Sequence, residues 1–224
     1  MRRALSLVWP PLRRSEWKIP FWLGSRRRLA KAIPVLKLVQ ACGWIPWVLQ
    51  NRRAAEVIHI ARHPGGFLNS WRSRYLADHD RGEVEAANRN RLKTIVQVAS
   101  TWADRFGDIE RMSVEEAELW YWRYSTETIH QAGAGSERYH LVIYEQLVAD
   151  TVGTARRLYE QCGLRWRDGV ERAIRTRASG SASLAAAWKT KLSAEHLELV
   201  ARILEESRME DWWQRETAVV SQPR

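Results

Sequence analysis

Residues 57–71 read Val-Ile-His-Ile-Ala-Arg-His-Pro-Gly-Gly-Phe-Leu-Asn-Ser-Trp. The β-branched residues Val57, Ile58 and Ile60 predict a short buried strand, because five or six apolar residues bounded by turn formers are typical of one. Pro64 suits the first position of a following helix, where its missing N–H costs nothing. The stretch therefore predicts a strand, a tight corner and a helix in immediate succession.

Arg62 at the end of that strand and Ser70 in the following helix are the first candidate site residues. A helix N-terminus offers free N–H groups and a partial positive charge, both of which favour an anion. The arginine adds a planar charged fork that matches phosphate oxygens. We therefore expect a phosphate site. The alternative is that Arg62 pairs with a carboxylate and Ser70 is an ordinary exposed serine.

The size and composition of the chain indicate one globular domain. It has 224 residues, 45% of them hydrophobic, and only two cysteines. Two cysteines make no disulfide framework, so we expect reduced thiols and a cytoplasmic location. No apolar run reaches the ~20 residues of a membrane span, and the N-terminal sequence lacks the apolar stretch of a secretory signal.

The positive charge is concentrated near the N-terminus. Residues 1–34 hold nine Lys and Arg against one Glu, a net charge of +8 out of the total of +10. We expect residues 1–32 to form a basic arm, followed by a domain over 33–210 and a tail over 211–224. The arm either contacts an acidic polymer or is simply a mobile or partly docked segment.

Further elements follow from apolar periodicity and from turn residues. Strands are predicted over 33–39 and 140–144, and a polar stretch without an assigned element over 175–187. Amphipathic helices are predicted over 84–106, over 114–132 with a Ser113–Glu116 capping box, before Gly163, and after Ser193. Strands that alternate with helices predict an α/β fold with a parallel sheet flanked by helices.

In such sheets ligands bind at the carboxyl ends of the strands. Lys37, Arg62 and Glu145 all lie near these predicted ends. We expect Glu145 to order the fold rather than to act as a base. His59 and His63 lie in or next to a strand, so their spacing does not form a helical zinc motif. The sequence therefore predicts no metal site.

Several of these segments together resemble a known family. The segment Ala-Arg62-His-Pro-Gly-Gly-Phe-Leu-Asn-Ser70 is similar to the 3'-phosphate-binding element of sulfotransferases that use 3'-phosphoadenosine 5'-phosphosulfate. The resemblance extends to Val35-Leu36-Lys37, to the segment 141–147 with its Tyr-Glu pair and the later Gly163-Leu164 corner, and to Trp188-Lys189. It covers roughly residues 33–205.

The resemblance implies a helix-rich fold like that of P-loop NTPases and the transfer of a sulfuryl group to a hydroxyl or amine. It also implies that Arg62 and Ser70 bind the 3'-phosphate and that Lys37 is a catalytic residue near the sulfuryl group. The donor would be a co-substrate, and the acceptor a small molecule or a carbohydrate.

The sequence departs from the family pattern at three places. It has no Gly-x-x-Arg/Lys-Ser-Gly-Thr loop for the 5'-phosphosulfate, which makes the expected fold an N-terminally truncated one. It has Val39 where many members have a basic histidine. The C-terminal Arg-Lys-Gly loop is also absent, and Arg177 is the candidate to replace its nucleotide contact. Two alternatives stay open: a non-catalytic nucleotide-binding relic, and a basic module that binds an acidic polymer.

Overall fold

The computed structural model describes residues 33–39, 41–178, 185–205, 207, 209 and 211–213. The chain divides into two compact units, Met1–Val39 and Gln40–Arg224. The expected basic arm, residues 1–32, lies outside the described residues.

The described part of the first unit is an extended, exposed segment over residues 33–39. The prediction of a strand there is wrong, because these residues form no ladder with any described strand. Strand propensity reflects how well a side chain fits a paired, half-buried surface, and it does not create a strand without a partner.

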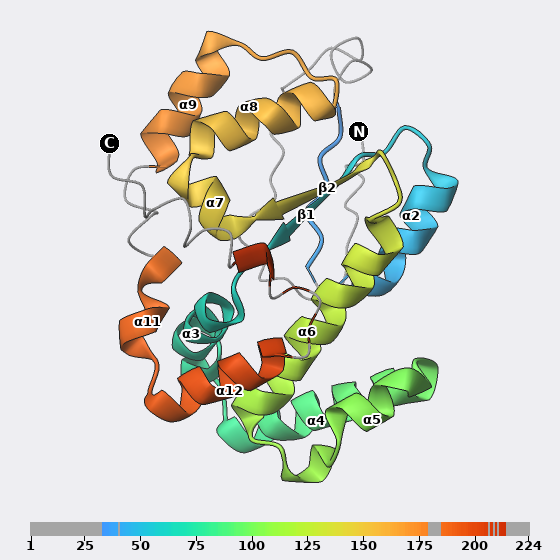
Figure 1. Ribbon diagram of the computed structural model, residues 1–224, viewed down its shortest axis with the longest axis vertical. Coiled ribbons are helices and arrows are strands. Elements are labelled where there is room, and N and C mark those ends of the chain that lie inside the picture. Colours follow the sequence, from blue (N-terminus) through green and yellow to red (C-terminus); the bar gives the residue numbers. More distant parts are fainter. Residues whose placement is uncertain are drawn as a thin grey trace, which may run out of the picture. The chain divides into compact units, whose positions relative to one another are not determined.

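The sheet of the second unit consists, in its described part, of two parallel strands (Figure 1). Strand β1 (Val57–Ala61) pairs with β2 (Tyr139–Ile143), and the register runs from Val57 opposite Tyr139 to Ala61 opposite Ile143. Both strands were predicted, β2 one residue later than its observed start. A parallel pair places both carboxyl ends at the same edge of the sheet.

Helices make up most of the remaining described chain, so the predicted helix-rich α/β class with a parallel sheet is confirmed. In chain order they are η1 (Cys42–Trp44), α2 (Ile45–Asn51), α3 (Pro64–Arg74), η2 (Leu76–Asp78), α4 (Arg81–Val98), η3 (Ser100–Trp102), α5 (Ala103–Phe106), η4 (Ile109–Arg111), α6 (Val114–Gly133), α7 (Tyr144–Ala149), α8 (Thr151–Gln161), α9 (Asp168–Ala178), α11 (Trp188–Lys191) and α12 (Ala194–Glu205).

Two predictions of secondary structure need correction. The single helix expected over 84–106 is broken at Ala99, whose φ of −141° and ψ of 70° are not helical. The break turns Trp102 so that its ring meets Tyr124 of α6 edge-on at 5.2 Å. The second correction concerns 175–187, since α9 continues to Ala178.

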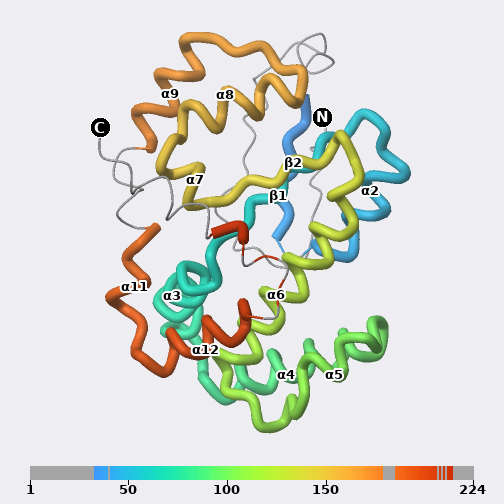
Figure 2. Tube along the Cα trace, viewed as in Figure 1, coloured from blue at the N-terminus to red at the C-terminus, as the bar shows by residue number. Residues whose placement is uncertain are grey.

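Helix α6 lies at the centre of the second unit (Figures 1 and 2), where it packs against α3, α4, α12 and β1. Its N-terminus is capped as predicted, since Ser113 Oγ accepts a hydrogen bond from the Glu116 N–H at 3.1 Å. The Glu116 carboxylate instead pairs with Arg202 of α12 at 2.7 Å. Apolar side chains of α3, α4, α6 and α12 form the main core: Leu68, Leu92, Ile95, Leu119, Trp120, Trp122, Val200 and Ile203.

A buried arginine joins α6 to α12 through this core. Arg123 is only 1% exposed. It donates to Glu127 Oε1 at 2.8 Å and to the Ile203 carbonyl at 3.1 Å. Arg105 of α5 approaches the other oxygen of the same carboxylate at 2.9 Å. The α5, α6 and α12 helices are thus held together by one buried polar network.

We predict that Arg123→Ala lowers the free energy of unfolding by about 3–5 kcal/mol, because it leaves Glu127 and a helix carbonyl buried without a main partner. Arg202→Ala, which removes an exposed ion pair between α6 and α12, is the control and is expected to cost less than about 1 kcal/mol. Urea unfolding measures both values. Equal losses for the two variants would contradict the assigned role of Arg123.

Candidate functional site

The carboxyl ends of β1 and β2 bring two chain segments together. Arg62 and His63 follow β1, while Tyr144 and Glu145 follow β2. The Arg62 guanidinium carbon lies 4.9 Å from the centroid of the Tyr144 ring, within the range of a cation–π contact. The predicted corner after β1 therefore faces the predicted Tyr-Glu pair.

Glu145 fixes this corner. One carboxylate oxygen accepts a hydrogen bond from the His63 backbone N–H at 3.1 Å. The other oxygen accepts from Trp213 Nε1 at 3.0 Å. Both oxygens thus hold the fold together, as expected for Glu145.

The start of α3 is capped by a histidine side chain. His63 Nδ1 accepts a hydrogen bond from the Gly65 N–H at 3.1 Å, so this nitrogen carries no proton and the imidazole is neutral. Its ring stacks on Trp188, with centroids 4.3 Å apart, and meets Trp213 edge-on at 5.4 Å. Burial, helped by the charge of Lys189, lowers the pKa of His63 to about 4.

The two glycines of α3 allow other groups to approach the helix closely. A Cβ on Gly65 would lie 2.3 Å from the Trp188 ring, and a Cβ on Gly66 would lie 2.9 Å from Arg62 Nε. The Arg62 side chain therefore lies directly on the backbone at the start of α3. Only a residue without a side chain permits this contact.

Arg62 Nε is buried and has no hydrogen-bond partner among the described residues. A buried, charged donor is costly to leave unpaired, and such a group is often reserved for a ligand. No carboxylate of the described chain pairs with Arg62, so the simple ion-pair alternative for this residue has no support here.

Ser70 lies on the same face of α3 as the Arg62 contact. It follows Gly66 by four residues, and residues four apart are neighbours on a helix surface. Its side chain is half-buried rather than fully exposed. By helical spacing, Ser70 therefore lies on the side of α3 that Arg62 contacts.

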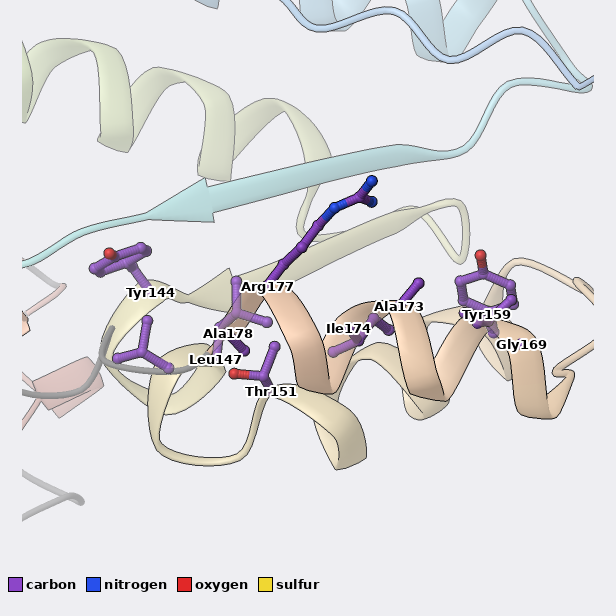
Figure 3. Close-up of a pocket in the computed structure, with 11 residues that line it drawn as sticks. Tyr144, Leu147, Thr151, Tyr159, Gly169, Ala173, Ile174, Arg177 and Ala178 are labelled. Carbon is purple, nitrogen blue, oxygen red and sulfur yellow. The ribbon is translucent and has the colours of Figure 1, made fainter.

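A pocket of about 620 Å³ opens between α7, α8 and α9 (Figure 3). Tyr144 lines it at the end of β2, and Arg177 of α9 lines it together with apolar residues such as Leu147 and Ile174. The Arg62 guanidinium also lies over the Tyr144 ring. This ring therefore contacts both the pocket and the corner after β1. Arg177 therefore lines a pocket that adjoins Arg62.

Lys37 lies in the first unit and its side chain is exposed. Since the two units are described separately, its role stays a prediction. Trp188 and Trp213 were not predicted as site residues. Trp188 stands in a motif of the resemblance, but no sequence pattern indicated that Trp213 would reach Glu145.

We predict that acid destabilises the fold partly through His63. The unfolded histidine binds its proton near pH 6.5 and the folded one only near pH 4, so lowering the pH between these values favours unfolding. The free energy of unfolding of the wild type falls as the pH is lowered to 4, and His63→Gln should reduce this fall by at most about 3 kcal/mol. His79→Gln, at an exposed histidine, controls for the substitution itself. Urea unfolding from pH 7 to pH 4.5 tests this, and superimposable profiles for wild type and His63→Gln would disprove it.

A comparison of the chain with protein-family profiles identifies one family. The profile of the sulfotransferase family matches residues 19–168, more than half of the chain. No curated protein and no solved structure gave a significant match. None of the described helices is long and apolar enough to span a bilayer. The chain belongs to the sulfotransferase family, whose fold is the P-loop-like α/β fold.

Proposed function

We propose that this sulfotransferase-like protein transfers a sulfuryl group from 3'-phosphoadenosine 5'-phosphosulfate to a hydroxyl or amine acceptor. The observation that carries the proposal is the buried Nε of Arg62, which lies against Gly66 near the start of α3 and has no hydrogen-bond partner in the part of the chain that the structure describes. Membership of the sulfotransferase family supports the type of reaction.

The charge of the Arg62 corner suits the 3'-phosphate of the donor. A guanidinium donates two parallel hydrogen bonds to phosphate oxygens, and Ser70 adds a hydroxyl from the same face of α3. The N-terminal end of this eleven-residue helix contributes a partial positive charge. Two negative charges on a phosphate monoester would thereby meet one full and one partial positive charge.

The nucleoside fits the neighbouring pocket. Tyr144 presents an aromatic face at the boundary between Arg62 and the pocket of about 620 Å³. The apolar lining of the pocket suits a purine ring. Arg177, which the sequence predicts as a nucleotide contact, supplies a cation in the same lining. We assign Arg62, Ser70 and Arg177 to nucleotide binding on these grounds.

In the reaction, an acceptor oxygen or nitrogen attacks the sulfur atom and the bond between sulfur and the bridging phosphate oxygen breaks. The products are the sulfated acceptor, adenosine 3',5'-bisphosphate and a proton. Negative charge grows on the leaving phosphate oxygen, so a cation directed at that atom lowers the barrier. We assign this role to Lys37, in a catalytic domain that spans residues 33–210.

A second candidate function is nucleotide binding without transfer. It is favoured by the sequence itself, which contains no Gly-x-x-Arg/Lys-Ser-Gly-Thr segment for the 5'-phosphosulfate. A protein that keeps only the 3'-phosphate half of the site would bind the nucleotide product but transfer sulfate slowly or not at all.

We predict that the unmodified chain binds adenosine 3',5'-bisphosphate in isothermal titration calorimetry. Arg62→Ala should weaken binding by about 10- to 100-fold, because a charged hydrogen bond is worth roughly 1.5–3 kcal/mol. Ser70→Ala should weaken it less, by about 2- to 10-fold. Arg74→Ala removes an exposed cation from the same helix and should leave the affinity unchanged.

No binding to the unmodified chain, or an equal loss in Arg62→Ala and Arg74→Ala, would reject the proposed nucleotide site. Transfer of labelled sulfate to phenol or sugar acceptors then distinguishes the two candidates. Transfer that is lost in Lys37→Met supports the enzyme, whereas tight binding without transfer supports the second candidate.

A further inference from the structure

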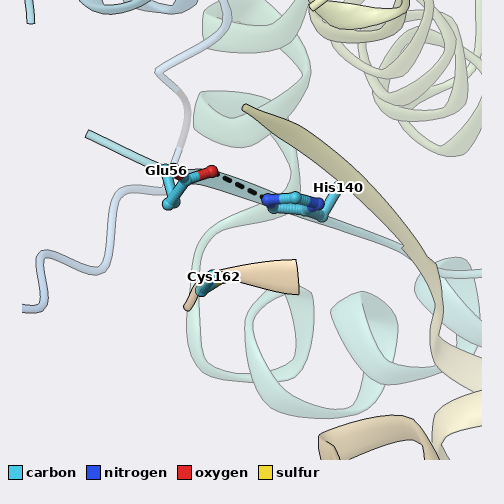
Figure 4. A group of neighbouring side chains, drawn as sticks. All are labelled: Glu56, His140 and Cys162. Carbon is cyan, nitrogen blue, oxygen red and sulfur yellow. Dashed lines mark hydrogen bonds and ion pairs between the residues drawn. The ribbon is translucent and has the colours of Figure 1, made fainter. Parts of the chain in front are cut away.

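A second cluster of reactive side chains lies at the opposite ends of the same two strands. Glu56 immediately precedes β1, His140 is the second residue of β2, and Cys162 follows α8. The carboxylate, imidazole and thiol atoms all lie within 4.8 Å of one another (Figure 4). Glu56 Oε2 is 2.8 Å from His140 Nε2. His140 therefore belongs to a group of three.

The backbone holds Glu56 and His140 in place. The Val57 N–H donates to the Arg138 carbonyl at 2.8 Å, and the Arg138 guanidinium donates to the carbonyls of Arg52 at 2.8 Å and Ala55 at 3.2 Å. These bonds fix the residues on both sides of Glu56. His140 is held directly by the β-ladder, in which it faces Ile58.

Cys162 is positioned by the end of α8. Its N–H donates to the Leu158 carbonyl at 2.9 Å. The next residue, Gly163, has a φ of 64°, a left-handed conformation that glycine adopts without strain. The chain thus turns directly after the cysteine, and the thiol is held toward His140 and Glu56 rather than carried along a flexible loop.

We propose that Glu56, His140 and Cys162 form a binding site for a divalent transition metal, best matched by zinc. One thiolate, one imidazole and one carboxylate are zinc ligands in proteins, with bonds of about 2.0–2.3 Å. A tetrahedral ion separates its ligand atoms by about 3.3–3.7 Å, so binding needs shifts of roughly 1 Å or less from the present arrangement. The Glu56 side chain is 33% exposed, which leaves a fourth position for water.

The charges of the cluster favour a cation. Burial and the nearby Glu56 carboxylate raise the pKa of the Cys162 thiol. Without metal, the thiol keeps its proton and the carboxylate bonds to the imidazole. A divalent ion neutralises the carboxylate and the thiolate together, replaces the Glu56–His140 hydrogen bond, and releases the thiol proton to solvent. This site is independent of the proposed nucleotide site, which lies at the carboxyl ends of the strands.

The test is titration of the untagged full chain with cobalt(II), which reports thiolate ligation by a sulfur-to-metal charge-transfer band. We expect one equivalent to bind with this band and zinc to displace it. The chain has only two cysteines, Cys42 and Cys162. Cys42→Ser should therefore keep the band, which assigns the thiolate to Cys162 even if a variant at Cys162 folds poorly.

Cys162→Ser should abolish the charge-transfer band. His140→Gln or Glu56→Gln should weaken cobalt binding by more than roughly 10- to 100-fold, which is the cost of losing a residue that only hydrogen-bonds to a metal ligand. Circular dichroism checks that each variant is folded. No thiolate band in the unmodified chain, or a band that is lost in Cys42→Ser, would overturn the proposal.

Discussion

The hydrogen bond from the His63 backbone N–H to Glu145 joins two segments that lie 82 residues apart in the sequence. It closes the edge of a parallel strand pair whose register places Ala61 opposite Ile143. Once these strands end together, the Arg62 corner and the Tyr144–Glu145 pair must face each other. The candidate nucleotide site depends on this single constraint, because neither segment contains all of its groups.

Neutral His63 connects this constraint to α3. Its Nδ1 accepts a hydrogen bond from the Gly65 N–H, and its ring stacks on Trp188. The next residue, Gly66, is in contact with the Arg62 side chain. A protonated imidazole could not accept that hydrogen bond, and burial opposes the charge. The Arg62 Nε has no hydrogen-bond partner among the described residues, and a buried donor without a partner costs stability in the free protein. In the proposed function, Arg62 is held in place for the anionic ligand before that ligand binds.

Local patterns in the sequence predicted the elements that depend on near neighbours. The strand at 57–61, the proline start of α3 and the Ser113 cap of α6 all follow from residues within one or two turns. The failures involve long-range pairing. Residues 33–39 have strand propensity, but no described strand pairs with them. The continuous periodicity over 84–106 gave no sign of the break at Ala99, which lets Trp102 reach Tyr124 of α6.

The candidate site divides in the same way. Arg62 and Ser70 could be selected because their spacing lies within one strand–helix unit. The Tyr144 contact depends on the strand register, and the approach of Trp213 to Glu145 depends on the packing after α12. The group of Glu56, His140 and Cys162 is spread over more than 100 residues, so no spacing rule detects it. Local motifs therefore identify single groups, whereas their convergence comes from the fold.

The decisive measurement is a crystal structure of the chain with adenosine 3',5'-bisphosphate. We expect the 3'-phosphate within hydrogen-bond distance of both the Arg62 guanidinium and Ser70 Oγ, and the adenine in the pocket lined by Tyr144. A nucleotide bound elsewhere, or with its 3'-phosphate held by other residues, would contradict the proposed site.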